Sequence, residues 1–377
     1  MIEIVPDQVR KGRGAISNRV GRFESFERVA TSDGWESGTD VGAAPGKESA
    51  RETENPEDLA PPLRTTLGVD AARRIITYNK SPDVPFDRSI NPYRGCEHGC
   101  IYCFARPTHA YYGLSPGLDF ETRLFHKPNA PELLAEELRK PGYVPATMAL
   151  GTNTDPYQPV ERKQKLTRRI LEVLAAFNHP FSLVTKSSLV VRDLDIIQPM
   201  AEKGLANVAV SVTTLDRTIA RKLEPRAPTP SKRIEAITAL AQAGVPTAVL
   251  AAPMIPALND AELETILEIA CAAGASAAGY ILLRLPLEIR DLFVEWLHGN
   301  FPDRADHVMS LVRDTRNGAD YNANWGTRMS GTGVYAALLN RRFKIASARL
   351  GFNKRRHNLD VSQFSIPPRP GDQLTLF

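Results

Sequence analysis

The stretch NPYRGCEHGCIYCFARP, residues 91–107, holds three of the four cysteines of the chain, Cys96, Cys100 and Cys103. The fourth, Cys271, lies in a distant apolar segment. The chain has 377 residues and a formal net charge of +4, and its few cysteines favour a reducing cytoplasm over a disulfide framework. It contains neither the roughly 18 apolar residues of a membrane span nor the apolar core of a signal peptide, so we expect a cytoplasmic protein without a membrane partner.

An alternation of β-rich and amphipathic helical runs begins near residue 88. Apolar runs predict strands over 146–152, 180–187, 206–214, 245–255 and 277–286, and a further strand should lead into Cys96. Helices are expected between them over 161–177, 192–204, 231–244 and 260–274. Six β/α units predict a parallel sheet with both faces covered. We expect an α/β fold, a partial (β/α)6 TIM-like barrel with a helical C-terminal extension. A dinucleotide-binding sheet is disfavoured because no G-x-G-x-x-G follows the first strand.

Composition divides the chain into four parts. Residues 1–85 are expected to form an N-terminal arm and a disordered linker, because about 30–62 are polar, acidic and rich in Pro and Gly. The basic arm before the linker is a solvated tail or an arm that touches nucleic acid. Residues 86–285 should form the barrel and 359–377 a flexible tail. Between them, 286–358 should form a helical extension, with helices over 286–299, 303–316 and 324–348.

The three clustered cysteines follow a predicted strand, which is where parallel α/β folds carry their functional groups. A structural zinc site needs four N or S ligands, usually as two separated pairs, and no second pair is present in the sequence. A thioredoxin-like pair would use Cys100 and Cys103 but leave Cys96 idle. Soft thiolates suit an iron–sulfur cluster, and three protein ligands on a four-iron cluster leave one iron open to an outside ligand.

The sequence CEHGCIYC resembles the signature of the radical S-adenosylmethionine superfamily, C-x3-C-x-aromatic-C. The resemblance covers roughly residues 88–285. It implies a 4Fe-4S cluster on Cys96, Cys100 and Cys103, with S-adenosylmethionine on the open iron and a flavodoxin- or ferredoxin-like electron donor. In that superfamily one electron splits the sulfonium to a 5′-deoxyadenosyl radical, which abstracts hydrogen from a substrate. The implied fold is a full or partial β/α barrel.

The resemblance also indicates candidate contacts to S-adenosylmethionine. Tyr102 matches the aromatic residue whose backbone meets the adenine. The turn GTNTDPYQP departs from the Gly-Gly-Glu-like turn of the family, yet it offers acceptors for an ammonium; an Asx turn before Pro156 is the alternative. Glu224 and Arg226 in LEPRAP pair the methionine zwitterion or form a surface ion pair. The candidate cofactor-binding residues are Tyr102, Gly151, Asn153, Thr154, Asp155, Lys186, Ser211, Thr213, Glu224 and Arg226.

Three motifs, NTDPYQPVE, VTKS and LEPRAP, resemble the subgroup around spore photoproduct lyase, which repairs a thymine dimer in DNA by hydrogen abstraction. That lyase needs a cysteine near the radical to return a hydrogen atom. Cys271 is the only spare cysteine, and it lies in an apolar helix. Tyr111, Tyr112 and Tyr157 are the possible substitutes. Repair of spore photoproduct itself is therefore disfavoured, and no catalytic residue is assigned.

Two basic clusters, RKQKLTRR at 162–169 and RRFKIASARLGFNKRRH at 341–357, favour a nucleic-acid partner, although such runs are usually solvated faces. The final QLTLF resembles the bacterial peptide that binds the DNA sliding clamp, with Gln373, Leu374, Leu376 and Phe377 as an amide and apolar anchors. We expect a radical enzyme that acts on nucleic acid, as in DNA repair. A radical modifier of tRNA or protein is one alternative. A non-catalytic metal protein that binds nucleic acid is the other.

Overall fold

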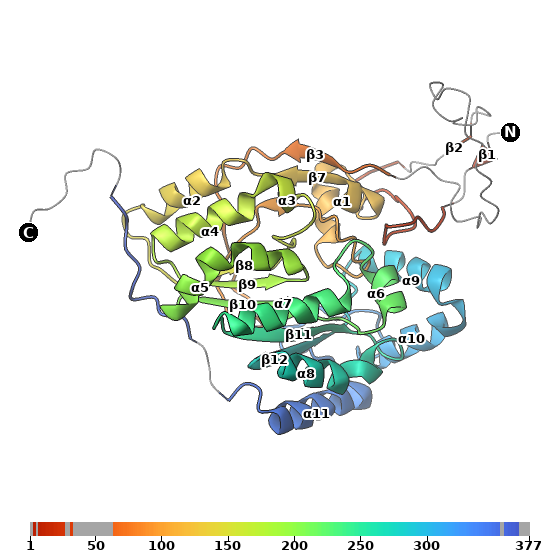
Figure 1. Cartoon of the computed structure of the whole chain (residues 1–377). Helices are drawn as coiled ribbons and strands as arrows, with labels where there is room; N and C mark the ends of the chain where they lie inside the picture. The colour runs from red at the N-terminus through yellow and green to blue at the C-terminus, as the bar shows by residue number, and fades with distance from the viewer. Residues whose placement is uncertain (1–2, 5–6, 27–30, 33–62, 355–357, 369–377) are drawn as a thin grey trace, which may run out of the picture.

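Six parallel strands form the central sheet of the computed structural model, which describes residues 3–4, 7–26, 31–32, 63–354 and 358–368. They are β5 (Arg88–Ile90), β8 (Met148–Leu150), β9 (Phe181–Thr185), β10 (Ala206–Ser211), β11 (Thr247–Met254) and β12 (Ala277–Leu282). Each strand pairs with the next along the chain (Figure 1). Antiparallel β4 (Ile76–Tyr78) adds to the edge at β5. Within the described residues β12 and β4 stay unpaired with each other, so the expected partial barrel is confirmed and remains open.

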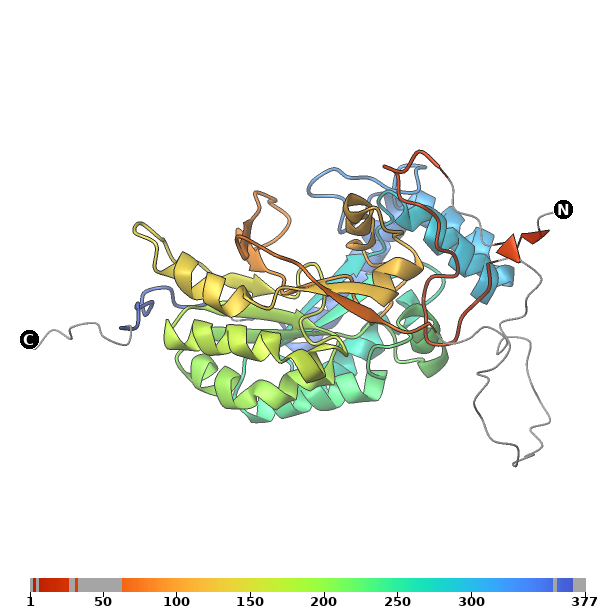
Figure 2. The same cartoon turned by 90° about the horizontal axis from the view of Figure 1, so that it is seen from above.

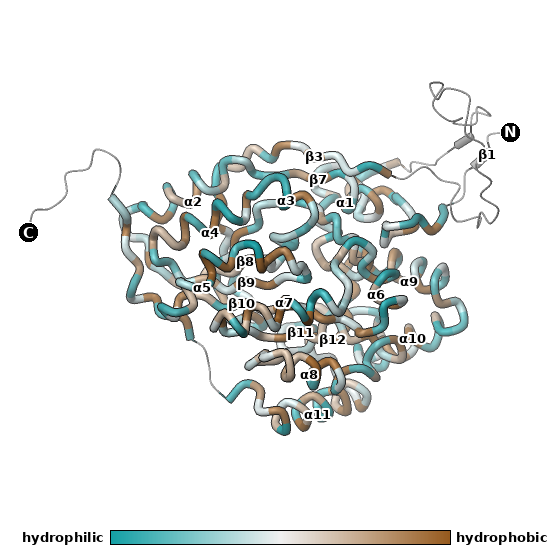
Figure 3. The backbone as a smooth tube through the Cα atoms, viewed as in Figure 1, coloured by the Kyte–Doolittle hydropathy of each residue, from teal (hydrophilic) through white to brown (hydrophobic). Residues whose placement is uncertain are grey.

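Helical crossovers join successive strands and cover the outer face of the sheet. In chain order the helices up to β12 are α1 (Leu118–Thr122), α2 (Ala130–Leu138), α3 (Glu161–Gln164), α4 (Leu166–Ala176), α5 (Leu194–Glu202), α6 (Arg217–Leu223), α7 (Pro230–Gln242) and α8 (Leu263–Ala272). Short 3-10 turns are η2 (Arg106–Tyr112), η3 (Ser188–Asp193) and η4 (Asp260–Glu262). Hydrophobic and hydrophilic residues are interleaved along helices such as α4 in Figure 3, as expected of helices with one apolar face toward a sheet.

The helix expected over 161–177 is interrupted. Lys165 takes a left-handed conformation with φ of 50°, which separates α3 from α4. Glu161 explains the break, because its carboxylate accepts from the backbone N–H groups of Leu166 and Thr167 at 2.9 and 3.0 Å. A carboxylate at the start of a helix satisfies donors that lack an intrahelical partner.

Strand residues alternate between two environments. In β9, Phe181, Leu183 and Thr185 are buried, while Ser182 and Val184 are only partly covered. Val184 on β9 and Leu250 on β11 line a cavity on the inner side of the sheet. The expectation of two fully covered faces is therefore wrong for the inner face, because the open barrel encloses a cavity there.

Three helices follow the barrel: α9 (Ile289–Asn300), α10 (Pro302–Asp314) and α11 (Gly333–Leu350). Helices α9 and α10 lie at the end of the molecule toward which β9 points, opposite α2 (Figures 1 and 2). The first part of the helix expected over 324–348 is instead a loop, in which Gly326 and Gly331 have φ near 80°. Helix α11 packs against α8 and β12, where the rings of Phe343 and Tyr280 lie 4.9 Å apart between centroids.

The N-terminal region contributes more structure than its composition predicts. Strands β3 (Thr66–Val69), β7 (Arg123–His126) and β6 (Tyr93–Arg94) form a second sheet, and β1 (Glu3–Ile4) pairs with β2 (Thr31–Ser32). The solvated-tail interpretation is wrong for residues 13–17, which are buried. Most of the expected linker, residues 33–62, lies outside the described residues. So do Gln373, Leu374, Leu376 and Phe377 of the clamp-like peptide.

Within the described part of the chain, every helix is too short or too polar to cross a lipid bilayer.

Two adjacent leucines on α11 test its packing against the barrel. Leu339 is 1% exposed and Leu338 is 53% exposed. Leu339→Ala should lower the free energy of unfolding by about 2–5 kcal/mol, because it removes buried methyl groups and leaves a cavity. Leu338→Ala should change it by about 0.5 kcal/mol or less. Urea denaturation of both variants measures the difference, and equal effects would contradict the docking of α11.

Candidate functional site

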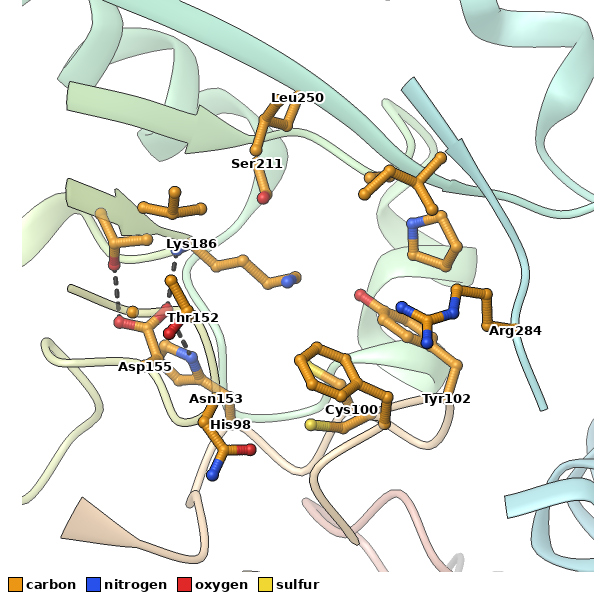
Figure 4. Close-up of a pocket in the computed structure, with 18 of the residues that line it drawn as sticks. His98, Cys100, Tyr102, Thr152, Asn153, Asp155, Lys186, Ser211, Leu250 and Arg284 are labelled. Atoms are coloured by element: carbon orange, nitrogen blue, oxygen red, sulfur yellow. Dashed lines mark hydrogen bonds and ion pairs between the residues drawn. The ribbon is translucent and has the colours of Figure 1, made fainter. Parts of the chain in front are cut away.

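The cysteine loop after β5 opens onto one cavity of about 290 Å³ (Figure 4). Cys96, Cys100 and Cys103 all line this cavity. The loop is attached to the fold on two sides, because the Cys96 N–H donates to the Phe120 carbonyl at 3.0 Å and the Ile101 N–H to the Leu223 carbonyl at 3.1 Å. The sequence prediction that the three cysteines belong to one site agrees with this geometry.

A buried arginine holds the loop from beneath. Arg106 is fully buried and donates to the carbonyl oxygens of Gly99 and Cys100 at 3.0 and 2.8 Å, and to those of Pro116 and Gly117. Its remaining partner is the buried carboxylate of Glu121, at 2.5 Å. Such a guanidinium fixes several carbonyls at once because its donors form a rigid planar fork.

The N-terminal segment closes over the same carboxylate. The backbone N–H groups of Gly14 and Ala15 donate to Glu121 at 3.0 and 2.8 Å. A Cβ atom on Gly14 would lie 1.9 Å from the Gly99 carbonyl oxygen, so a residue with a side chain does not fit there. The arm that the sequence indicated as a solvated tail is therefore part of the support of the cysteine loop.

The thiols suit a cluster more than a single ion. Burial raises the pKa of all three, that of Cys100 to about 12, so a metal must displace protons from them. Within the described residues, no three Cys, His, Asp or Glu side chains converge on one ion position. A single zinc ion needs all its sulfur ligands at about 2.3 Å. Three thiols spread over one cavity wall fit an iron–sulfur cluster, which takes thiolates at separate irons.

Asp155 organises the turn after β8. One carboxylate oxygen accepts from the Tyr157 N–H at 2.9 Å, which forms the Asx turn that the sequence left as an alternative, and from the Thr185 hydroxyl at 2.6 Å. The other accepts from the Lys186 N–H at 2.8 Å and faces His98 Nδ1 at 3.3 Å. Burial opposes ionisation of Asp155, but His98 and these hydrogen bonds hold its carboxyl pKa below the usual range.

The turn residues divide between the cavity and the fold. Gly151, Asn153 and Asp155 line the cavity, and their contact with S-adenosylmethionine stays a prediction. Gly151 has φ of 82°, and a Cβ atom there would lie 1.9 Å from the Val184 carbonyl oxygen. Thr154 differs: it is 2% exposed and its hydroxyl donates to the Tyr93 carbonyl at 3.0 Å. Thr154 therefore anchors the turn instead of facing the cavity.

Lys186 reaches into the cavity from the end of β9 (Figure 4). Its ammonium lies 5.8 Å from the ring centroid of Tyr102, which also lines the cavity, as does Ser211 at the end of β10. Burial acts to lower the pKa of Lys186, but Cys100 and Glu224 outweigh it and the pKa is raised. Lys186 is thus a cation at neutral pH that faces the same space as the thiols.

Glu224 lies behind Tyr102, outside the described residues that line the cavity. Its carboxylate accepts from the Thr213 hydroxyl at 2.6 Å and from the Tyr102 hydroxyl, and it forms a buried ion pair with Arg233 of α7. Burial opposes its ionisation, but Arg233 and Lys186 hold its pKa below the usual range. Thr213 is fully buried in this network.

Glu224 and Arg226 do not act as a pair. Arg226 contacts Glu97 in the cysteine loop at 3.3 Å, and its side chain is 37% exposed. Glu224 has its counter-charge from Arg233 instead. The alternative of a surface ion pair between Glu224 and Arg226 is wrong, because Glu224 is buried and pairs with Arg233 of α7. Contact of either residue with S-adenosylmethionine stays a prediction.

The suggested hydrogen-return residues lie away from the cavity lining. Cys271 is half-buried on α8, 3.6 Å from the Leu350 carbonyl oxygen of α11. Tyr157 is buried and donates to Asp193 at 3.0 Å. Tyr111 and Tyr112 are 69% and 40% exposed. Among the described lining residues, Tyr102 carries the only phenol and the three clustered cysteines the only thiols.

Several cavity residues were not among the sequence candidates. Phe104 follows Cys103 directly, and this position next to the motif is the only sequence feature that could have indicated a role in the site. His98 was noted only as a residue inside the loop. Arg284, at the end of β12, had no distinguishing sequence pattern (Figure 4).

Some arginines of the two basic clusters form ion pairs where the structure describes them. Arg168 pairs with Asp193 and Asp195, and Arg169 with Glu132. On α11, Arg342 pairs with Glu264 at 2.6 Å, while Arg349 pairs with Glu268. Residues 355–357 of the second cluster lie outside the described residues. These paired charges weaken the sequence argument that the clusters bind nucleic acid.

Replacing the buried arginine tests the support of the cysteine loop. Arg106→Met should lower the free energy of unfolding by about 3–5 kcal/mol, because Glu121 would stay buried without its counter-charge. The matched control is Arg123→Met, whose side chain is 51% exposed and lies 3.8 Å from Asp119. That variant should lose about 1 kcal/mol or less. Guanidinium denaturation of both distinguishes them; an Arg106→Met protein as stable as the control would refute this role.

The sequence of this chain is similar to those of known proteins. Residues 90–270 match the Radical SAM superfamily. An uncharacterized protein of Mycobacterium tuberculosis is 40% identical over 240 residues, which cover 62% of this chain and 71% of the relative. An uncharacterized protein of Methanocaldococcus jannaschii is 29% identical over 191 residues, covering 51% and 68%.

The fold has counterparts among solved structures. Spore photoproduct lyase complexed with dinucleoside spore photoproduct superimposes with a TM-score of 0.54 at 15% identity, over 76% of this chain and 80% of that protein. At this identity the likeness concerns the fold. The fold likeness, the matched residues 90–270 and the three thiols on one cavity agree. The chain belongs to the radical SAM superfamily of enzymes.

Proposed function

We propose that this chain binds a 4Fe-4S cluster through Cys96, Cys100 and Cys103 and S-adenosylmethionine beside it, and abstracts hydrogen from a nucleic-acid substrate. Superfamily membership implies both cofactors. The observation that carries the assignment to these residues is that all three thiols line one cavity, together with Lys186, Asn153 and Ser211. When bound, the cluster supplies the electron that splits S-adenosylmethionine into methionine and a 5′-deoxyadenosyl radical.

The chain supplies the binding groups around that chemistry. Lys186 offers a cation to the methionine carboxylate, since its ammonium has no hydrogen bond or ion pair within the described residues. Asn153 and the carbonyl groups of the turn after β8 offer acceptors to the methionine amine. Ser211 offers a hydroxyl to the ribose. Tyr102 offers a contact to the adenine, and Glu224 fixes its position by accepting a hydrogen bond from its hydroxyl.

The nucleic-acid substrate is the finer part of the proposal. The structurally similar lyase was solved with a dinucleoside lesion, and three motifs of this chain resemble its subgroup. Repair of that lesion itself is not proposed, because Cys271 lies outside the described cavity lining and the three other thiols are assigned to the cluster. We propose a different damaged or modified nucleotide as the substrate.

Cysteine substitutions test the cofactor assignment. Cys96→Ser, Cys100→Ser and Cys103→Ser should each abolish cluster binding, because a cluster with three protein ligands cannot lose one. Cys271→Ser is the matched control and should keep full iron content, since it packs between α8 and α11. Iron analysis and 5′-deoxyadenosine formation after anaerobic reconstitution, with a flavodoxin or chemical reductant, give the readout. A Cys103→Ser protein with full iron and activity would end the assignment.

We also propose that QLTLF binds the DNA sliding clamp, on the sequence resemblance alone. Leu376 and Phe377 would enter an apolar groove, and a peptide of this size should bind near micromolar affinity, about −8 kcal/mol. Leu376→Ala with Phe377→Ala should abolish binding to purified clamp and leave 5′-deoxyadenosine formation unchanged. Thr375→Ala is the control, because Thr375 lies between the proposed anchors. Equal binding by the double variant and the wild type would remove this partner.

A further inference from the structure

The cavity has a second wall that the cofactor proposal leaves unused. Arg284 lies opposite the turn after β8 (Figure 4), and the lining also includes Phe104, Met329, Val84 and Phe86. Figure 4 shows Lys186 and Arg284 extending toward the cavity from opposite sides. Lys186 and the turn after β8, which offer the proposed contacts to methionine, lie on the side away from Arg284, whereas Tyr102 lies beside Arg284 (Figure 4). The Arg284 side is therefore the part of the cavity that remains for the substrate.

Arg284 forms no ion pair within the described residues, and Asp83 acts on it only as a more distant charge. The only hydrogen bond of Arg284 there is a long one of 3.4 Å to the Tyr321 hydroxyl, and its buried Nε has no partner. A buried donor without an acceptor is uncommon in a folded protein and requires an explanation. A guanidinium in this state suits the oxygens of a phosphate, which it contacts with two parallel hydrogen bonds.

A second arginine adds positive charge behind the first. Arg316 is buried and donates to the carbonyl oxygens of Thr327 and Leu283 at 3.1 and 2.7 Å, with no carboxylate partner in the described residues. Burial and the neighbouring Arg284 lower the pKa of Arg316 to about 10, so Arg316 is a cation at neutral pH. Two adjacent cations therefore attract an anion to this wall.

An exposed aromatic ring stands beside Arg284. Phe104 is 47% exposed although it follows Cys103 directly, and the Arg284 guanidinium carbon lies 5.5 Å from its ring centroid. An exposed ring beside a cation is the combination that proteins use for an unpaired nucleotide, with the base stacked on the ring and the phosphate on the cation. A base paired in a duplex cannot stack in this way, so the target nucleotide must be unpaired or extruded.

The rim of this wall is held together by residues far apart in sequence. Asp83 accepts from the Gly326 N–H at 2.7 Å and pairs with Arg328, which also donates to the Ser81 hydroxyl at 2.5 Å. These contacts join the segment carrying Val84 and Phe86 to the loop carrying Met329. Asp83 is thereby held by Arg328 in an ion pair, and it acts on Arg284 only as a more distant charge.

We infer that Phe104 and Arg284 form the substrate subsite, which binds one unpaired nucleotide by base stacking and phosphate contact. The inference rests on the proposed function, because it names the substrate class of the same cavity. Within the described residues, the Arg284 side chain forms no hydrogen bond with Cys96, Cys100 or Cys103. Both are substrate-binding residues and not cluster ligands.

The test is binding of a labelled single strand of about 10 nucleotides to reconstituted full-length protein, measured by fluorescence anisotropy at several salt concentrations. Arg284→Gln should weaken binding about tenfold or more and flatten the slope of log affinity against log salt by about 0.7, the value for one phosphate contact. Phe104→Leu should weaken binding at least about fivefold through lost stacking and leave the slope unchanged. A duplex of the same sequence should bind more weakly than the single strand.

Matched controls keep the result interpretable. Arg290→Gln removes an arginine that is 45% exposed and paired with Asp291 and Asp320, and Phe23→Leu removes an exposed ring outside the cavity lining. Both should bind like the wild type. Iron content checks the fold of every variant, and if Arg284→Gln loses iron, Phe104→Leu decides alone.

Different measurements would overturn this inference and the proposed function. Wild-type protein that fails to bind the single strand, or Phe104 and Arg284 variants that bind it normally, would overturn the subsite. The same protein would still form 5′-deoxyadenosine without any oligonucleotide if the cofactor proposal holds. Loss of 5′-deoxyadenosine formation in the wild type would instead overturn the proposed function.

Discussion

The buried guanidinium of Arg106 is the contact on which the site depends. It holds the carbonyl groups of Gly99 and Cys100 and pairs with Glu121, which in turn binds the backbone of Gly14 and Ala15. A loop with several inward-facing carbonyls needs donors, because an unsatisfied buried carbonyl costs about 1–3 kcal/mol. One arginine supplies them and leaves the three thiols free to face the cavity.

The C-terminal extension stabilises the same loop from the other side. Ile101 and Tyr102 pack in one apolar cluster with Phe293 and Trp296 of α9. The Trp296 indole N–H donates to the Lys222 carbonyl of α6 at 3.1 Å, which ties α9 to the segment before Glu224. The cysteine loop is therefore held between an ion pair and an apolar core. Rigid support of this kind is what a site for radical chemistry requires, since its ligands must keep their positions.

The acidic side chains around the cavity each face a basic partner. Glu224 is matched by Arg233 and Asp83 by Arg328, while Asp155 faces His98. Lys186 and Arg284 face the cavity without an ion pair in the described residues, although Glu224 acts on Lys186 and Asp83 on Arg284 as more distant charges. In the outer basic clusters, Arg168, Arg169 and Arg342 pair with neighbouring acids. The argument for an anionic substrate therefore rests on the cavity more than on the surface.

The sequence alone predicted the parallel sheet, its six strands and the cysteine site, because hydrophobic periodicity and the C-x3-C-x2-C spacing are local properties of the chain. It also predicted that Asp155 and Lys186 lie near the cysteines, since they follow neighbouring parallel strands. The structure alone decided that Arg233 pairs with Glu224, that residues 13–17 support the loop and that Arg284 faces Phe104. These contacts join segments separated by up to 180 residues in the chain. Such pairs have no local pattern, because only the packing of the barrel brings them within hydrogen-bonding or van der Waals range.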